Sequence, residues 1–187
     1  MIQRGILLKR YLTAKGFLLM DKIFLRKAIH QKIASRKVQP QTLLERLKPF
    51  LHQNVLSYFP LGKELDISVI NQFLFDQGRL FFPKVMGNEL KICRATQLEP
   101  FHTDLLGTRI CDKWEIASLY DLNTLLIPAV AVDLSFQRLG RGGGFYDRLL
   151  AKIDSGIPRL TIIYKEQLVE TLPVDFWDQK VDKVFVF

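Results

Sequence analysis

The sequence predicts an α/β domain of three layers, in which helices flank a mainly parallel sheet. Apolar runs with strand character alternate along the chain with segments whose apolar residues recur every three or four positions, an order typical of α/β folds. The runs at residues 124–132 and 160–164 are apolar almost throughout, as in strands buried on both faces of a parallel sheet. Ligands of such sheets gather at the carboxyl ends of the strands, so we expect the site on that rim.

Three segments have helical spacing. The first begins at Asp21, an acid suited to the first turn of a helix, and continues to Ile33. The second covers residues 67–75 and ends near Gly78, and the third begins at Phe145. Strands are expected at residues 55–59, 80–83, 90–93, 124–132, 160–164 and 184–187, with the ends of the first and fourth on the same rim.

Length and composition fit one compact enzyme domain. A chain of 187 residues that is 48% hydrophobic can bury a full core, and nothing in it resembles a linker or a repeat. The two cysteines and three histidines lack the spacing of metal ligands, so we expect reduced thiols and no histidine-based metal site.

The net charge of +8 raises the question of a nucleic-acid partner. Residues 1–20 contain four cations and no acid, so they supply half of this charge and leave the rest of the chain mildly basic. The sequence has no track of alternating aromatic and basic residues. We therefore expect no nucleic-acid partner.

Residues 1–20 are interpreted as a basic extension before a single domain over residues 21–187. Their apolar stretches are too short for a signal-peptide core and are separated by Lys9 and Arg10, so secretion is not expected. The sequence predicts no transmembrane segment and no membrane partner, and the cytoplasm is the expected location. A misassigned start with Met20 as the initiator, a disordered arm and an additional helix all stay open for this extension.

The most informative stretch is residues 138–148, which place four glycines among three arginines and Asp147. Glycines tolerate positive φ and let the backbone approach a ligand, and free N–H groups at a helix start favour an anion, so a phosphate is the expected ligand. The alternative is a tight strand-to-helix turn in which Asp147 suits the helix start. A turn alone, however, needs no such concentration of cations.

Two common phosphate-binding loops are excluded at this stretch. A Walker A loop requires a lysine followed by Ser or Thr, which is missing. The last glycine of a dinucleotide fingerprint would fall on Phe145 when counted from Gly140 and on Asp147 when counted from Gly142. The loop is therefore of another kind.

Read back through Pro128 and Asp133, this stretch resembles the signature of the 5-formyltetrahydrofolate cyclo-ligase family. In that family Arg-Leu-Gly-x-Gly-x-Gly-Tyr-Tyr-Asp follows a Pro…Asp strand end, and here Phe145 replaces the first tyrosine. Four further segments are similar to family motifs in the same order: Lys22 to Arg26, Tyr58 to Asp66, Tyr164 to Gln167 and Asp178 to Val184. The matches are spread over residues 22–184.

The chain departs from the family pattern at three places. Ala129 and Val132 replace a glycine and an aromatic residue, and both changes are apolar. Over residues 107–111 the chain has Gly-Thr-Arg-Ile-Cys where Gly-Ile-x-Glu-Pro is expected, which leaves that part of the pocket undetermined.

The resemblance implies the ATP-dependent cyclisation of 5-formyltetrahydrofolate to 5,10-methenyltetrahydrofolate, with release of ADP and phosphate. The formyl oxygen would attack the γ-phosphate, N10 would close on the activated carbon, and phosphate would leave. The implied partners are ATP and 5-formyltetrahydrofolate, the implied cofactor is Mg²⁺, and a monomer is expected. The alternatives are a relative with another substrate and a basic nucleic-acid-binding or regulatory module without catalysis.

The resemblance also assigns roles to residues. Arg138, Arg141 and Asp147 would be catalytic, and Asp147 and Asp178 would bind Mg²⁺. The implied substrate-binding residues are Phe59, Glu64, Arg141, Gly142, Gly143, Gly144 and Phe145. The implied ATP-binding residues are Lys22, Ile23, Phe24, Leu25, Arg26, Arg138, Leu139, Gly140, Arg141, Gly142, Gly143, Gly144, Phe145 and Tyr146.

Several of these positions have a purely structural alternative. Lys22 and Arg26 lie four residues apart, so both face one side of a helix, either towards phosphates or towards solvent. In the alternative view, Glu64 is an exposed acid at a helix start. Phe59 is then a core residue, and Asp178 is an acid in a surface turn. Asp133 is expected to brace the loop.

Overall fold

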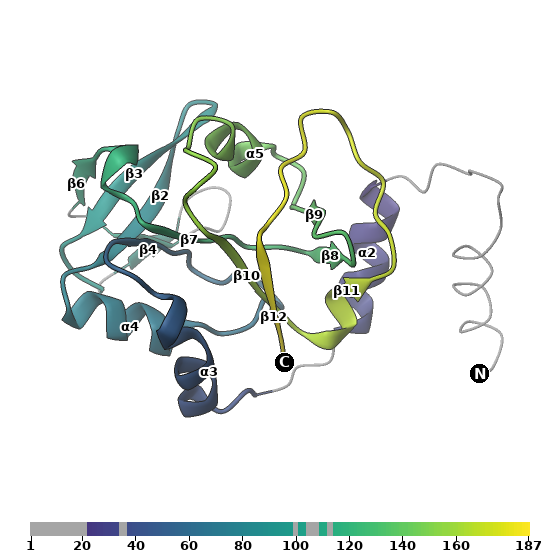
Figure 1. Cartoon of the computed structure of the whole chain (residues 1–187), viewed down its shortest axis with the longest axis horizontal. Coiled ribbons are helices and arrows are strands. Elements are labelled where there is room, and N and C mark those ends of the chain that lie inside the picture. The colour runs from purple at the N-terminus through teal and green to yellow at the C-terminus, as the bar shows by residue number, and fades with distance from the viewer. Residues whose placement is uncertain (1–21, 34–36, 99–100, 104–108, 112–113) are drawn as a thin grey trace, which may run out of the picture.

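The computed structural model describes residues 22–33, 37–98, 101–103, 109–111 and 114–187. The expected extension at residues 1–20 and part of the divergent 107–111 segment lie outside the described residues. A seven-stranded sheet organises the molecule, in the order β12-β10-β7-β1-β2-β3-β6 (Figure 1). Its strands are β1 (Val55–Leu56), β2 (Leu80–Met86), β3 (Glu89–Ala95), β6 (Trp114–Ala117), β7 (Thr124–Leu126), β10 (Arg159–Ile163) and β12 (Lys183–Val186).

Two smaller sheets accompany the large one. They consist of β8 (Ala131–Asp133), β9 (Arg138–Leu139) and β11 (Leu168–Val169), and of β4 (Phe101–Thr103) and β5 (Arg109–Cys111). The helices are α2 (Lys22–Lys32), α3 (Pro40–Leu47), α4 (Ser68–Asp76) and α5 (Phe145–Leu150), with short 3-10 turns η1 (Lys48–Phe50), η2 (Leu119–Asp121) and η3 (Lys165–Gln167).

The predicted α/β fold with a mainly parallel sheet is confirmed. Strands β12, β10, β7, β1 and β2 pair in parallel, and β3 and β6 continue the sheet antiparallel from β2. Because β1 lies between β2 and β7, with Val55 level with Leu80 and Thr124, the carboxyl ends of these three strands meet on one rim. This is the rim on which the site was expected.

Helices cover both faces of the sheet, as Figure 1 shows for α5 and for α3 with α4. On one face, residues of α2, α3 and α4 such as Ile29, Leu47 and Ile70 form a core with alternate strand residues. On the other face, Leu149 and Leu150 of α5 pack in a second core with the intervening strand residues. Alternation of side chains along each strand thus produces the three layers.

The prediction of one strand over residues 124–132 is wrong. The run divides into β7, in the large sheet, and β8, in a smaller sheet. Ile127 makes a last ladder hydrogen bond to Leu160 (2.8 Å), and Pro128, which has no N–H, cannot continue the ladder. The segment stays buried because the side chain of Gln167 donates to the carbonyls of Ala129 (2.9 Å) and Val130 (3.1 Å). The apolar pattern of residues 124–132 indicates that the segment is buried, but it does not indicate whether its backbone pairs with another strand.

Other predicted elements differ in length or partner. The expected strand at 55–59 is reduced to β1, and the expected strands at 80–83 and 90–93 are longer and form an antiparallel hairpin. The helix expected from Phe145 ends at Leu150. The helix α3 was not predicted, although Pro40 in its first turn is a usual start signal.

Asp133 was expected to brace the glycine loop (residues 140–144), but its hydrogen bonds brace the turn between β8 and β9, just before that loop. This residue is 3% exposed. Its Oδ1 accepts hydrogen bonds from the backbone N–H groups of Ser135 (2.8 Å) and Gln137 (3.0 Å), and its Oδ2 accepts one from Leu172 (3.0 Å). One carboxylate therefore holds the β8–β9 turn to the segment that follows β11.

Replacement of Asp133 by alanine is expected to lower the free energy of unfolding by about 2–4 kcal/mol, because three backbone donors, one buried and two part-buried, lose a charged acceptor. Urea unfolding measures this loss. The Asp133→Asn variant keeps the acceptor for the β8–β9 turn and should lose less, while Asp76→Ala on α4 controls for removal of an acid elsewhere. Equal stability of Asp133→Ala and the wild type would contradict the bracing role.

Candidate active site

A cavity of about 580 Å³ lies on the rim where β1, β2 and β7 end. Five parts of the chain line it: α2, the segment 58–64 after β1, the β2–β3 hairpin, the segment 128–130 after β7, and the glycine loop with the start of α5. The loop 175–178 completes it. Most of the predicted site residues are thereby brought together, although they are far apart in the sequence.

The helix α2 presents two cations to this cavity, as predicted from their spacing. Arg26 Nε donates to the carbonyl of Gly140 in the glycine loop (2.7 Å). Lys22 Nζ lies 2.7 Å from Asp175 Oδ2 and 2.5 Å from Asp178 Oδ2. Partial burial alone would lower the pKa of the Lys22 amine, but hydrogen bonds and charges from the two aspartates together raise that pKa.

The three residues between these cations do not line the cavity. Ile23 and Phe24 are exposed, and Leu25 packs against the core. Their predicted part in ATP binding remains a prediction that the geometry does not favour.

The glycine loop joins β9 to α5 and packs closely against arginine side chains. Gly142 (φ 107°) and Gly144 (φ 65°) have backbone conformations that other residues rarely adopt. A Cβ atom at Gly142 would lie 3.3 Å from the Arg26 guanidinium, and one at Gly144 would lie 2.7 Å from the guanidinium of Arg148. The glycines thus let the arginines approach the backbone. The helix α5 has only six residues, so its dipole is small. An anion at this loop would therefore be attracted mainly by the arginines and the loop N–H groups.

Arg148 ties the glycine loop to the β2–β3 hairpin. Its guanidinium donates to the carbonyls of Gly143 (3.0 Å) and Asn88 (3.0 Å). The hairpin contributes Val85 and Leu90 to the cavity wall. Arg148 itself does not line the cavity, so it supports the wall from behind.

Arg138 and Asp147 form a buried ion pair at the centre of the site. The Arg138 side chain is 3% exposed, and its guanidinium lies 2.7 Å from Asp147 Oδ1 and 3.2 Å from the Pro128 carbonyl. Asp147 Oδ1 also accepts a hydrogen bond from the backbone N–H of Gln179 (3.3 Å). Arg138 Nε is buried without a hydrogen-bond partner among the described residues. The pair joins the end of β7, the glycine loop and the segment before β12.

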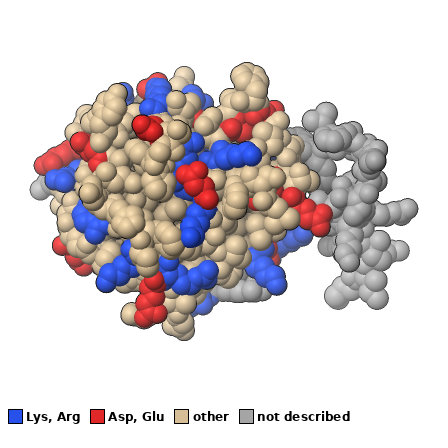
Figure 2. Space-filling model, viewed as in Figure 1, with Lys and Arg blue, Asp and Glu red and all other residues tan. Residues whose placement is uncertain are grey.

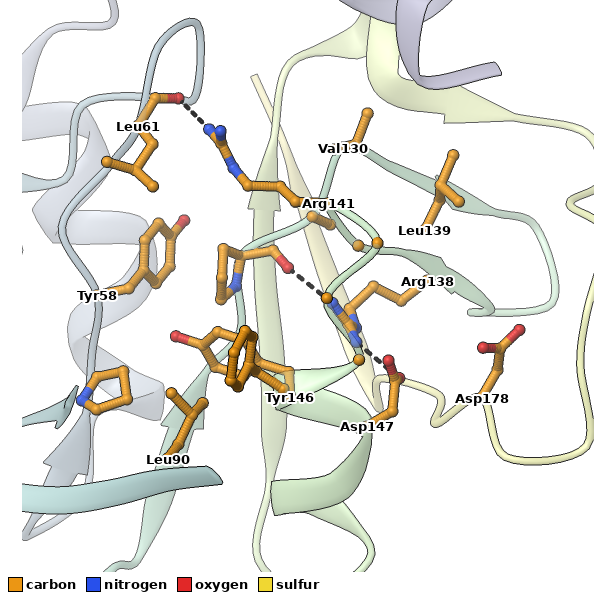
Figure 3. Close-up of a pocket in the computed structure, with 18 of the residues that line it drawn as sticks. Tyr58, Leu61, Leu90, Val130, Arg138, Leu139, Arg141, Tyr146, Asp147 and Asp178 are labelled. Atoms are coloured by element: carbon orange, nitrogen blue, oxygen red, sulfur yellow. Dashed lines mark hydrogen bonds and ion pairs between the residues drawn. The ribbon is translucent and has the colours of Figure 1, made fainter. Parts of the chain in front are cut away.

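Arg141 and Glu64 form a second ion pair, across the cavity. Glu64 Oε1 lies 2.9 Å from Arg141 Nε, and Glu64 Oε2 accepts a hydrogen bond from the backbone N–H of Leu61 (2.9 Å). Arg141 also donates to the Leu61 carbonyl (Figure 3). Burial raises the pKa of Glu64, and the charge of Arg141 only partly offsets that effect.

Aromatic and apolar side chains form one end of the cavity. Phe59 stacks on Phe82 with ring centroids 4.1 Å apart, and both line the cavity. Tyr58 is buried beside them and Tyr146 is partly buried, and desolvation raises the pKa of both hydroxyls. In Figure 3 these tyrosines and Leu90 lie on one side, Asp147 and Asp178 lie on the other, and Arg138 and Arg141 lie between. The cavity therefore has an aromatic end and a charged end.

Sequence reasoning missed part of this lining. Pro83, Val85 and Leu90 come from the β2–β3 hairpin, and Asp175 and Trp177 come from the loop before β12. A strand was expected over residues 80–83, but its end was not assigned to the rim of the site. The other positions depend on tertiary contacts that no local pattern encodes.

The predicted metal ligands, Asp147 and Asp178, both line the charged end. Asp147 is paired with Arg138 and Asp178 with Lys22. The described residues contain no group of three or more His, Cys, Asp or Glu side chains that could hold a metal ion. Two carboxylates fit Mg²⁺, which keeps several waters and takes its remaining ligands from phosphate oxygens.

The fold and the cavity define an α/β enzyme in which a charged subsite and an aromatic subsite meet at a glycine–arginine loop. The model of the 5-formyltetrahydrofolate cyclo-ligase family matches residues 21–187. The chain therefore belongs to this family, and the resemblance noted in its motifs is confirmed.

Individual relatives match over most of the chain. The 5-formyltetrahydrofolate cyclo-ligase of Haemophilus influenzae is 29% identical over 172 residues, which cover 85% of this chain and 88% of that protein. The enzyme of the same name from Mycolicibacterium smegmatis is 36% identical over 134 residues, or 66% of this chain and 68% of that protein. The NMR structure of Aquifex aeolicus 5,10-methenyltetrahydrofolate synthetase has a TM-score of 0.75 and 28% identity, and the match covers 89% of this chain and 90% of that one.

The raised pKa of Glu64 predicts a specific dependence of stability on pH. When burial raises the pKa of a carboxyl, the folded state binds more protons than the unfolded state between the two pKa values, so the free energy of unfolding falls as pH rises. The wild type should therefore lose stability relative to Glu64→Gln from pH 4.5, the usual pKa of this group, up to the raised value, and hold a constant difference above it.

Urea unfolding of the two proteins at a series of pH values measures this difference. Asp76→Asn serves as the control for an acid outside the cavity. If the wild type instead gained stability over Glu64→Gln across the same range, the charge of Arg141 would outweigh burial.

Proposed function

We propose that this protein catalyses the ATP-dependent cyclisation of 5-formyltetrahydrofolate to 5,10-methenyltetrahydrofolate, with release of ADP and phosphate. Membership of the cyclo-ligase family supports this reaction. The observation that carries the assignment of roles is the division of one cavity into an aromatic end and a charged end, with Arg141 at the junction. Two substrates of different chemistry thus have adjoining places.

The aromatic end suits the reduced pterin. Its ring system would contact Tyr58, which is buried, and Phe59 and Tyr146, which are partly buried. Glu64 is held by Leu61 and Arg141 at the edge of this end, where its carboxylate can accept hydrogen bonds from N–H groups of the pterin. Burial strengthens such hydrogen bonds.

The charged end suits the phosphates of ATP. Lys22 and Arg26 reach it from α2, and the glycine loop presents backbone N–H groups and Arg141. Arginine and lysine side chains bind phosphate oxygens through charge-assisted hydrogen bonds. When bound at Asp147 and Asp178, Mg²⁺ would neutralise phosphate charge and orient the γ-phosphoryl group.

The chemistry requires alignment and charge neutralisation rather than a protein nucleophile. The formyl oxygen attacks the γ-phosphorus, and the bond to the bridging oxygen breaks to release ADP. The phosphorylated oxygen is then a good leaving group, so N10 closes on the formyl carbon, loses its proton, and phosphate departs. Arg141 and Arg26 would stabilise charge on the transferring group, and Arg138 would hold the loop in place.

We also propose that the protein is a cytoplasmic monomer without a nucleic-acid partner. On the face shown in Figure 2, basic and acidic side chains are interspersed and form no band of one sign. Within the described residues no helix has the length and apolarity needed to cross a membrane. The charges of the cavity are accounted for by a nucleotide.

The reaction has a direct assay. Formation of the methenyl product, followed by its near-ultraviolet absorbance, is expected only when the protein, ATP, Mg²⁺ and 5-formyltetrahydrofolate are all present. ADP and phosphate should appear in equal amounts with the product. Folded protein that forms no methenyl product under these conditions would refute the proposed function.

Asp147→Asn is expected to lower kcat by about 100-fold or more, because the variant removes a charge from the proposed metal site. The amide oxygen can still accept from Arg138 and Gln179, but the buried Arg138 guanidinium loses its counter-charge, so the melting temperature should fall and kcat is compared where the variant is folded. Asp147→Ala is a poorer substitute, since it removes the acceptor as well as the charge, at a cost of about 3–5 kcal/mol. Asp76→Asn is the matched control, and an unchanged kcat and Mg²⁺ dependence in Asp147→Asn would exclude Asp147 as a ligand.

A further inference from the structure

Two large aromatic side chains are exposed in the segment between β11 and β12. Phe176 is 93% exposed and Trp177 is 54% exposed, and their rings meet edge to face with centroids 4.3 Å apart. Exposure of so much aromatic surface to water is unfavourable, and it commonly marks a binding site. Trp177 also lines the cavity.

The position of Trp177 is fixed relative to the proposed phosphate site. A tight turn holds residues 175–178, since the Asp175 N–H donates to Asp178 Oδ2 (2.8 Å) and the Asp178 N–H donates to the Asp175 carbonyl (3.0 Å). Lys22 binds both aspartates. One turn along the same helix, Arg26 binds the glycine loop at Gly140. These contacts place the indole at the charged end of the cavity.

The aromatic end already has its own rings, and Trp177 is separate from them. Tyr58, Phe59 and Tyr146 are buried or partly buried and line the cavity with Glu64, whereas Trp177 adjoins Asp178 in sequence and is half exposed. A half-exposed indole beside the charged end of the cavity fits a ligand that carries a second flat ring on an anionic group. The ring of such a ligand would stay partly open to solvent. The purine base of a nucleotide has these properties.

We propose that Trp177 is the stacking platform for the purine base of ATP, with Phe176 supporting the indole edge. The inference rests on the proposed function, since it places the base of the nucleotide whose phosphates the glycine loop would bind. Stacking of a base on an aromatic ring adds affinity without reading the edge of the base. Trp177 thus binds the base, while Lys22 and Arg26 bind phosphate.

Fluorescence and calorimetry test the proposal without turnover. The chain contains two tryptophans, so Trp114→Phe leaves Trp177 as the only indole. Addition of ADP with Mg²⁺ to this variant should quench its fluorescence, and tripolyphosphate, which lacks a base, should bind without comparable quenching. Trp177→Ala in the wild-type background should raise the Kd for ADP about tenfold and leave the Kd for tripolyphosphate within about twofold.

Two variants make the result specific. Trp177→Phe keeps a stacking ring and should recover most of the ADP affinity. Tyr120→Ala removes another exposed aromatic side chain that does not line the cavity and should change neither Kd.

The possible outcomes separate the inference from the proposed function. Unchanged ADP affinity in Trp177→Ala, with normal ADP binding by the wild type, overturns the role of Trp177 alone. An equal loss of affinity for ADP and tripolyphosphate also overturns it, because the variant would then have disturbed the phosphate site. Failure of the wild type to bind ADP at all overturns both the inference and the proposed function.

Discussion

The ion pair between Arg138 and Asp147 is the interaction on which the geometry of the site depends. A guanidinium that is 3% exposed is stable only with a counter-charge and hydrogen-bond acceptors, and Asp147 and the Pro128 carbonyl supply them. Since Arg138 precedes the glycines and Asp147 follows them, their pairing fixes both ends of the loop. The main-chain conformation of the glycines is thus set by charges on either side, and the loop can present N–H groups without a long helix behind it.

Charge balance within the cavity supports the proposed pairing of a nucleotide with a metal ion. Four cations and four acids line the cavity: Lys22, Arg26, Arg138, Arg141, Glu64, Asp147, Asp175 and Asp178. A polyphosphate attracts the cations and repels the acids, so it gains little from a balanced wall. A divalent cation between the acids and the polyphosphate attracts both, and so replaces their repulsion by attraction. The proposed roles of Asp147 and Asp178 therefore follow from the balance of the whole lining as well as from motif position.

Sequence reasoning recovered the parallel strands and the charged half of the site, for identifiable reasons. Buried parallel strands are continuous apolar runs, and the charged residues lie in local motifs such as Lys22 to Arg26 and the glycine loop. The prediction failed at residues 124–132, because the same apolar pattern is found in a paired strand and in a buried segment without pairing. Burial continues through Pro128 there, while strand pairing does not. Sequence reasoning also missed the hairpin wall at Val85 and Leu90, because an apolar residue in a strand carries no mark of the cavity that it will face.

Arg141 belongs to the glycine loop, yet its hydrogen bonds go to Glu64 and Leu61 on the other side of the cavity. The same guanidinium would keep Glu64 and Leu61 as partners and offer its remaining N–H groups to a phosphate, so the two halves of the cavity share one group. By thermodynamic reciprocity, whatever one ligand does to the affinity for the other is returned by the same factor. Under the proposed function a single side chain would couple the two binding steps, and the order in which the ligands arrive cannot change the free energy of the complex that they form together.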